Sequence, residues 1–275
     1  MLVCDRRAVA RRGLLVGPVR GFVVEAVRRF SSGLWIMPIA KEGWREIASA
    51  TIGLGLFAGF ASRVHWVLVI PIIVIWFWVV AFFRDPRREG QFQPGQMCAP
   101  ADGTVTEVTR LARCADVGGP AIRVGIFLSL FNVHINRSPC AAVVRSTHHQ
   151  PGKYLDARHP DSGRLNESNT LVLDVSSPHA GPVVVRQVAG FVARRIVCHA
   201  EPGTRLERGQ RFGLIKFGSR TELIVPDVEG TDITVRVGDK VRAGVTLILS
   251  QPAAPGSRSD DDHEQRQTRS TRAFA

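Results

Sequence analysis

The sequence predicts an α+β fold that is mainly β, in which an N-terminal hydrophobic helical hairpin precedes a compact β-sandwich or β-barrel domain. Two observations support this prediction. Two apolar runs lie between residues 47 and 83, and after Pro86 the chain changes to short β-branched runs separated by Gly, Pro, Asn and Asp, which is typical of strands and turns. A length of 275 residues, 45% of them hydrophobic, allows one globular domain with appendages.

The two ends of the chain are expected to lie outside the folded part. Residues 1–36 are rich in Arg and only weakly apolar, without the uninterrupted apolar core and cleavage site of a secretory signal. Translation could begin at Met37, so this segment is expected to be either untranslated or a disordered extension. Residues 252–275 are rich in Ser, Asp, Arg and Gln, and we expect them to be disordered.

Residues 37–90 are expected to form a membrane-associated hairpin. The run His65–Phe83 has no formal charge and approaches the roughly 20 residues that cross a bilayer core as a helix. A shorter, glycine-rich apolar run, Ile47–Ala61, precedes it. Basic residues flank both outer ends of the pair, so the positive-inside bias places these ends at the cytoplasmic face of the cell membrane. A buried core hairpin is the alternative, which the tryptophans of an all-apolar segment disfavour.

Residues 91–251 are expected to form the β domain. The expected strands are Gly103–Val108, Ile122–Leu128, Thr170–Val175, Val183–Val192, Thr221–Val225, Ile233–Val237 and Val245–Leu249. A frame of Gly, two residues, an apolar residue, two residues and Gly occurs at 203–209 and again at 238–244. The repeat predicts equivalent tight turns between strands, and similar turns occur in lipoyl- and biotinyl-like carrier domains.

Charge and cysteine content limit the possible partners. The net charge of +12 indicates an anionic partner, which could be nucleic acid, an anionic lipid surface or a phosphate-bearing substrate. Five cysteines without CxxC or Cys/His spacing predict neither a disulfide framework nor a zinc site, and reduced thiols are typical of the cytoplasm. His148 and His149 would face opposite sides of a strand, so no metal site is expected there.

The Gly218–Ser219 pair interrupts an apolar strand. A Gly-Ser pair taken alone is most often a turn. The functional interpretation is that glycine, without a Cβ, permits a strained backbone in which the Ser219 hydroxyl approaches the Gly218 carbonyl carbon. Attack there would convert the peptide bond to an ester, and elimination and hydrolysis would leave a pyruvoyl group on the new N-terminus.

Eight sequence blocks, in order, resemble the phosphatidylserine decarboxylase proenzymes of the short, bacterial-type branch. They are MPIAKEGW (37–44), FFRDP (82–86), PADG (100–103), FLSLFNVHINRSP (127–139), PGKY (151–154), NESN (166–169), VAGFVARRIVC (188–198) and ERGQRFGLIKFGSR (207–220). The resemblance implies self-cleavage between Gly218 and Ser219, a β chain that ends at Gly218, and an α chain that begins with a covalent pyruvoyl cofactor made from Ser219. It further implies conversion of phosphatidylserine to phosphatidylethanolamine and CO₂ through a Schiff base to that group.

The chain departs from the better-known family pattern at two places. Phe217-Gly-Ser-Arg220 replaces a Leu-Gly-Ser-Thr motif, with the Gly-Ser pair intact. Arg137 stands where the longer branch has a second His, so a charge-relay role carried over from that His is in doubt.

Proton transfer needs a base before cleavage and an acid after decarboxylation, and imidazole suits both near neutral pH. His134 is the candidate for each role, and Asp102, in the turn 100–103, is the candidate to orient it. Without the resemblance, an ordinary Asp-Gly turn and a histidine satisfied within a strand are the simpler interpretations. Lys153, Arg194 and Arg195 are basic residues that could meet a lipid phosphate.

Two other function classes fit the sequence less well. A membrane-tethered lipoyl- or biotinyl-like binding module would need an acceptor lysine in a tight turn, whereas Lys216 lies in an apolar strand. A nucleic-acid-binding membrane protein would need a stripe of aromatic and basic residues, and the aromatic residues are instead concentrated in the apolar runs. No nucleic-acid partner is therefore expected.

Overall fold

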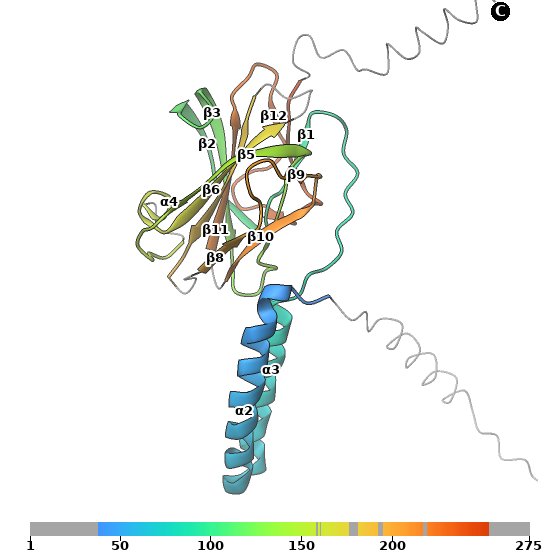
Figure 1. Ribbon diagram of the computed structural model, residues 1–275, viewed down its shortest axis with the longest axis vertical. Helices are drawn as coiled ribbons and strands as arrows, with labels where there is room; N and C mark the ends of the chain where they lie inside the picture. The colour runs from blue at the N-terminus through green and yellow to red at the C-terminus, as the bar shows by residue number, and fades with distance from the viewer. Residues whose placement is uncertain are drawn as a thin grey trace, which may run out of the picture. The chain divides into compact units, whose positions relative to one another are not determined.

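The computed structural model describes residues 38–157, 159, 161–175, 181–191, 195–216 and 219–252 (Figure 1). The predicted extension 1–36 and nearly all of the predicted tail lie outside these residues. The helices are η1 (Lys41–Gly43), α2 (Trp44–Val64), η2 (Trp66–Leu68), α3 (Val69–Phe82) and α4 (Ser162–Leu165). The strands are β1 (Gln96–Cys98), β2 (Gly103–Cys114), β3 (Gly119–Leu128), β4 (Ile135–Arg137), β5 (Ala142–Gln150), β6 (Ser168–Val175), β7 (Val183–Ala189), β8 (Arg195–Cys198), β9 (Arg205–Leu206), β10 (Arg211–Lys216), β11 (Ser219–Pro226), β12 (Asp232–Ile233), β13 (Lys240–Val241) and β14 (Leu247–Ser250).

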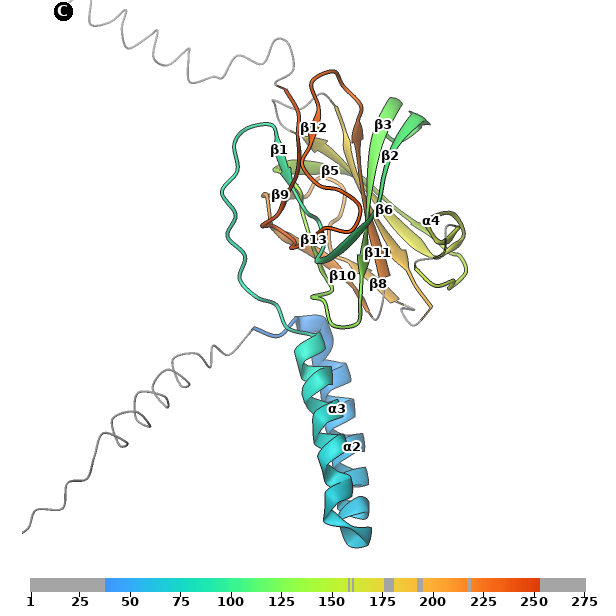
Figure 2. The same ribbon diagram turned by 180° about the vertical axis from the view of Figure 1, so that it is seen from behind.

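The two apolar runs form the predicted helical hairpin. Helices α2 and α3 lie side by side in both views (Figures 1 and 2), and the Trp76 indole donates to the Thr51 hydroxyl at 2.8 Å. The open end is closed by a hydrogen bond from the Ala40 N–H to the Phe83 carbonyl at 2.9 Å. Pro71 lies in the first turn of α3, where an N–H has no intrahelical acceptor, so the proline is tolerated.

The first helix, not the second, meets the length criterion for a membrane span. The helical segment Lys41–Val64 is long and apolar enough to cross a bilayer, and 11% of its apolar window is buried inside the protein. The segment Trp66–Phe82 is apolar but shorter, and the extended backbone of His65 separates it from the first helix.

The β domain confirms the predicted mainly β fold. Its main sheet has eight strands in the order β13-β2-β3-β11-β7-β6-β5-β9, and two three-stranded sheets have the orders β1-β14-β12 and β4-β10-β8. One core cluster joins side chains of all three sheets, among them Met97, Leu171, Phe212, Leu223 and Ile248. The core therefore lies between the large sheet and the two small ones, as in a sandwich.

The repeated glycine frame forms the two edges of the large sheet. Gly203 and Gly238 have positive φ values of 86° and 102°, which glycine adopts without a Cβ clash. Each is followed by one of the two-residue edge strands, β9 and β13. The prediction of equivalent turns is thus confirmed.

The strands differ from the predictions in several places: the strand predicted for Val183–Val192 ends at Ala189. The run Ile233–Val237 forms only the two-residue strand β12. Strand β5 was not predicted, because its second half, RSTHHQ, is polar and its outer residues are exposed. The strand is nevertheless held by antiparallel pairing with β6 over its full length.

Candidate active site

Three neighbouring strands change sheets at the same level. Strand β10 lies in a small sheet between β4 and β8, while β11 lies in the large sheet between β3 and β7. Strand β10 ends at Lys216 and β11 begins at Ser219. At this point β11 pairs with the last residue of β3, Leu128, and the last residue of β7, Ala189, while β4 and β8, the next strands along the chain from each, flank β10.

The predicted cleavage site falls at this crossing. Gly218 itself lies outside the described residues. Ser219 begins β11 and is completely buried, and its Oγ has no hydrogen-bond partner within the described part of the chain. A buried hydroxyl without a partner costs about 1–3 kcal/mol, so it calls for a functional explanation. An oxygen that makes no other hydrogen bond is suited to act as a nucleophile.

His134 ends the loop that flanks the crossing. Its backbone carbonyl accepts from the Ile215 N–H at 3.2 Å, which places it beside the last residues of β10. Its ring is buried and lies 4.3 Å, between centroids, from the ring of Phe82 in α3. The end of the hairpin therefore forms one wall around this imidazole.

The tautomer and charge of His134 follow from its surroundings. Nδ1 lies 3.0 Å from the Asn132 carbonyl oxygen, which can only accept, so Nδ1 carries the proton and Nε2 is the basic nitrogen. Burial lowers the pKa of His134 to about 4, and the nearby positive charge of Arg84 acts in the same direction, against the hydrogen bond to Asn132. The imidazole is therefore neutral at physiological pH, as a general base must be.

Asp102 has different partners from the one that we expected. One carboxylate oxygen accepts from Arg88 at 2.7 Å and the other from the Ala243 N–H at 2.8 Å. The Asn132 carbonyl accepts the hydrogen bond of the His134 Nδ1. Asp102 and His134 are still linked electrostatically through Arg84. The charge of Arg84 lowers the pKa of His134, and the charge of Asp102 raises the pKa of Arg84.

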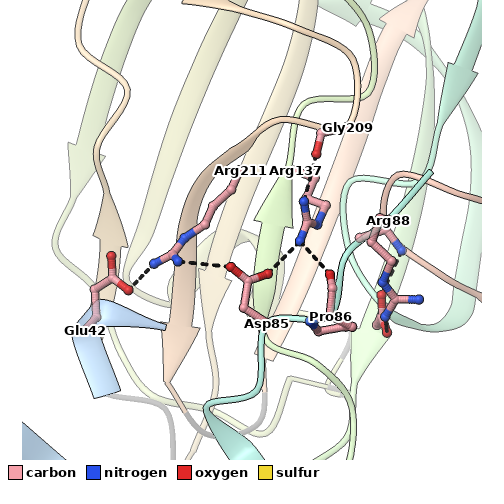
Figure 3. A network of polar contacts seen from close by, with 9 residues as sticks. Glu42, Asp85, Pro86, Arg88, Arg137, Gly209 and Arg211 are labelled. Carbon is pink, nitrogen blue, oxygen red and sulfur yellow. Dashed lines mark hydrogen bonds and ion pairs between the residues drawn. The ribbon is translucent and has the colours of Figure 1, made fainter. Parts of the chain in front are cut away.

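A network of ion pairs fastens both ends of the hairpin to the strands of the site (Figure 3). Arg137 of β4 donates to Asp85 at 2.6 Å and to the carbonyls of Pro86 and Gly209. Arg211 of β10 joins Asp85 to Glu42 of η1. Arg137 therefore holds the chain that leaves the hairpin, a structural role unlike that of a histidine relay.

A chain of buried amide side chains, which no sequence pattern marks, ends at Thr221, two residues after Ser219 in β11. Gln187 donates to Asn136 at 2.9 Å and accepts from Asn169 at 3.1 Å, and Asn136 donates to Thr221 at 3.0 Å. These four side chains come from four strands and are all buried. Asn136 and Asn169 lie in the motif blocks 127–139 and 166–169, but only the folded sheets show that they meet.

This architecture defines a class: a β-rich enzyme with a buried serine and a neutral histidine at a strand crossing, attached to an apolar hairpin. A carrier module fits poorly, because Lys216 is buried and paired with Glu46. The chain belongs to the phosphatidylserine decarboxylase family, whose model matches residues 77–249.

Curated relatives named phosphatidylserine decarboxylase proenzyme support this assignment. The protein of Symbiobacterium thermophilum is 44% identical over 214 residues, covering 78% of this chain and 96% of the relative. That of Rhodopirellula baltica is 38% identical over 211 residues, with 77% and 87% covered. That of Nitrosomonas europaea is 39% identical over 210 residues, with 76% and 94% covered. The predicted family is thereby confirmed, and with it the assignment of the chain as a decarboxylase enzyme of phospholipid synthesis.

Proposed function

We propose that this protein is a self-cleaving, pyruvoyl-dependent decarboxylase that converts phosphatidylserine to phosphatidylethanolamine and CO₂. Its relatives carry the name of that substrate and the word proenzyme. The observation that carries the proposal is Ser219, buried at the first position of β11, with an Oγ that has no hydrogen-bond partner among the residues that the structure describes.

Maturation requires Ser219 to act on the preceding peptide bond. Nε2 of His134 takes the hydroxyl proton, and Oγ attacks the carbonyl carbon of Gly218, so that the amide bond breaks and an ester forms. Loss of the Cα proton of residue 219 with cleavage of the Cβ–Oγ bond releases the Gly218 carboxylate and leaves dehydroalanine. Addition of water with loss of ammonia gives the pyruvoyl group. The cofactor thus needs no separate binding site.

Strand pairing explains how the two chains would remain together after cleavage. Strand β11 pairs along its whole length with β3 and over six residues with β7. A chain that begins at residue 219 therefore stays in the centre of the large sheet. The partners of this protein include its own two chains.

The pyruvoyl group supplies an electron-poor carbonyl that can take up the electrons left on the substrate Cα when CO₂ departs. Residues of the protein supply the proton that the substrate Cα then takes up. His134 is held in one tautomer by the Asn132 carbonyl, and it would return a proton to that carbon. Asp102 would contribute from a distance, by balancing the positive charge of Arg84 near the imidazole.

We further propose that the hairpin attaches the enzyme to the cytoplasmic face of the cell membrane. Large apolar side chains are exposed along both helices, among them Leu56, Phe57, Phe60, Val74 and Phe77. An exposed apolar surface of this kind is unfavourable in water and favourable in lipid. Basic residues at the outer ends suit an anionic membrane surface.

The mass of the purified protein tests the proposal. We expect two pieces, residues 1–218 and 219–275, the second with a blocked N-terminus and the mass of a pyruvoyl group. Ser219→Ala should give one intact chain without decarboxylase activity, since no other residue can supply the ketone. An intact wild-type chain with full activity would refute the self-cleavage mechanism. An intact, inactive wild-type chain would favour the membrane-tethered binding module.

A further inference from the structure

We propose that a cavity beside the open end of the hairpin binds the phosphodiester of the lipid through Arg45 and Arg195. This inference rests on the proposed function, because it assigns the substrate's head group. The cavity has a volume of about 600 Å³. Residues of η1 and α2 line one side, and residues of β8 and β10 line the other; those used below are Glu42, Arg45, Glu46, Arg195, His199 and Lys216.

The cavity is close to the cleavage site along the chain. Lys216 lines it and precedes Ser219 by three residues. Three residues span at most about 11 Å between Cα atoms. A head group whose phosphate lies in the cavity can therefore extend its serine moiety toward residue 219.

The charges of the cavity are not balanced within the protein. Arg195 and Lys216 are directly opposite in the pairing of β8 with β10, and like charges opposed in this way repel one another. Glu46 forms an ion pair with Lys216, and the charge of Arg195 also acts on this carboxylate and helps to lower its pKa, so one carboxylate is shared by two cations. An anion near Arg195 would relieve the remaining repulsion.

The second acidic residue of the cavity, Glu42, is also already paired. Glu42 bonds to Arg211 and to His199, the latter at 2.6 Å. Arg45 and Arg195 are exposed, and neither forms an ion pair within the ranges that the structure describes. These two guanidinium groups are therefore the cations available to a ligand, and a guanidinium donates to phosphate oxygens in a bidentate manner.

The position of Arg45 on the hairpin fits the depth of a lipid phosphate. Arg45 is the second residue of α2, whose 21 residues extend for roughly 30 Å, about the thickness of a hydrocarbon core. If the apolar part of α2 lies in that core, Arg45 lies where the core meets the head groups. The phosphodiesters of a bilayer lie at that level.

Binding to the uncleaved protein tests the proposal without catalysis. Ser219→Ala protein in neutral detergent is titrated with dihexanoyl phosphatidylserine by calorimetry, below the micellar concentration of the lipid. Adding Arg45→Gln and Arg195→Gln should weaken binding about tenfold, because two solvent-facing charge contacts, each worth a few-fold, multiply. Arg236→Gln is the matched control: Arg236 is exposed and distant in sequence from the cavity residues, so its variant should bind like the parent.

Further arms distinguish a lipid head group from a free anion. Inorganic phosphate should compete only weakly with the lipid. Arg195→Lys in place of Arg195→Gln should restore part of the lost affinity for the lipid. Equal affinity of the parent and the double variant would overturn the proposal. Tighter binding of inorganic phosphate than of the lipid would also overturn it, since the site would then serve a free anion.

Kinetics of the processed enzyme separate this inference from the function on which it rests. The double Arg variant should self-cleave normally and show a KM for phosphatidylserine about tenfold higher, with kcat within about twofold of the parent. A processed wild-type enzyme without decarboxylase activity would refute the proposed function and leave the binding result intact. An unchanged KM in an active enzyme would refute the head-group site alone.

Discussion

Acidification should stop self-cleavage at an unusually low pH, because His134 is buried as a neutral base. Its pKa is lowered to about 4, against about 6.5 for an exposed histidine. At pH 5 about nine-tenths of the imidazole is then in the basic form, whereas an ordinary histidine would be about 3% basic. The cleavage rate should therefore be nearly constant from pH 8 to about 5.5 and fall by half near pH 4.

The assay follows freshly made chain before it matures. Protein labelled during cell-free synthesis is diluted into buffers between pH 3.5 and 9, and the loss of the full-length band on a denaturing gel gives the cleavage rate. His134→Ala should slow cleavage about 100- to 10,000-fold, and its residual rate should rise with pH as hydroxide replaces the missing base. A wild-type midpoint near pH 6.5, or normal cleavage in the variant, would refute the assignment of His134.

The same proton should make folding stability depend on pH. Between about pH 6.5 and 4 the unfolded chain binds a proton at His134 that the folded chain does not, so stability falls as the pH falls through this window. A depression from 6.5 to about 4 corresponds to about 3 kcal/mol. Urea unfolding of Ser219→Ala protein, with and without His134→Gln, isolates this contribution, because carboxylates that titrate at low pH are common to both. If the free energies of unfolding of the two proteins changed with pH in parallel, His134 would not be held neutral in the folded protein.

Three further predictions concern the framework of the site and the membrane hairpin. Arg137→Met removes the bonds to Asp85, Pro86 and Gly209. It should lower the free energy of unfolding in urea by about 2–3 kcal/mol, after allowance for partial exposure. The control is Arg145→Met, in an exposed pair with Asp174, which should cause no measurable change. Gly213→Ala would place its Cβ 2.2 Å from the Val197 carbonyl oxygen. The variant should therefore be destabilised by at least about 2 kcal/mol and show less self-cleavage on gels. Gly119→Ala, with open space around it, is the control and should show neither effect. Leu56→Asp, at an exposed position of α2, should reduce flotation with lipid vesicles, because an acidic residue costs about 3 kcal/mol at the centre of a membrane helix; flotation equal to that of Leu56→Ala would argue against insertion of the hairpin.

Hydropathy and local pattern were sufficient for the hairpin and for much of the sheet. The apolar runs Ile47–Ala61 and His65–Phe83 identify two helices because each residue's preference for lipid or core is a local property. Strand β5 shows the limit of this reasoning. Its polar half becomes a strand only because β6 offers partners for its backbone, and that pairing leaves no periodic signal in the segment itself.

The sequence motifs by themselves determined the family and marked Gly218, Ser219, His134 and Asp102 as candidates, because such residue types stand in recognisable blocks. Only the tertiary structure decided the surroundings of His134: the Asn132 carbonyl lies at its Nδ1, and Phe82 of the hairpin contacts its ring. The physical reason is sequence separation. Contacts such as that of Glu42 with Arg211, 169 residues apart, exist only once three strands cross between sheets beside the hairpin, and no local pattern encodes that crossing.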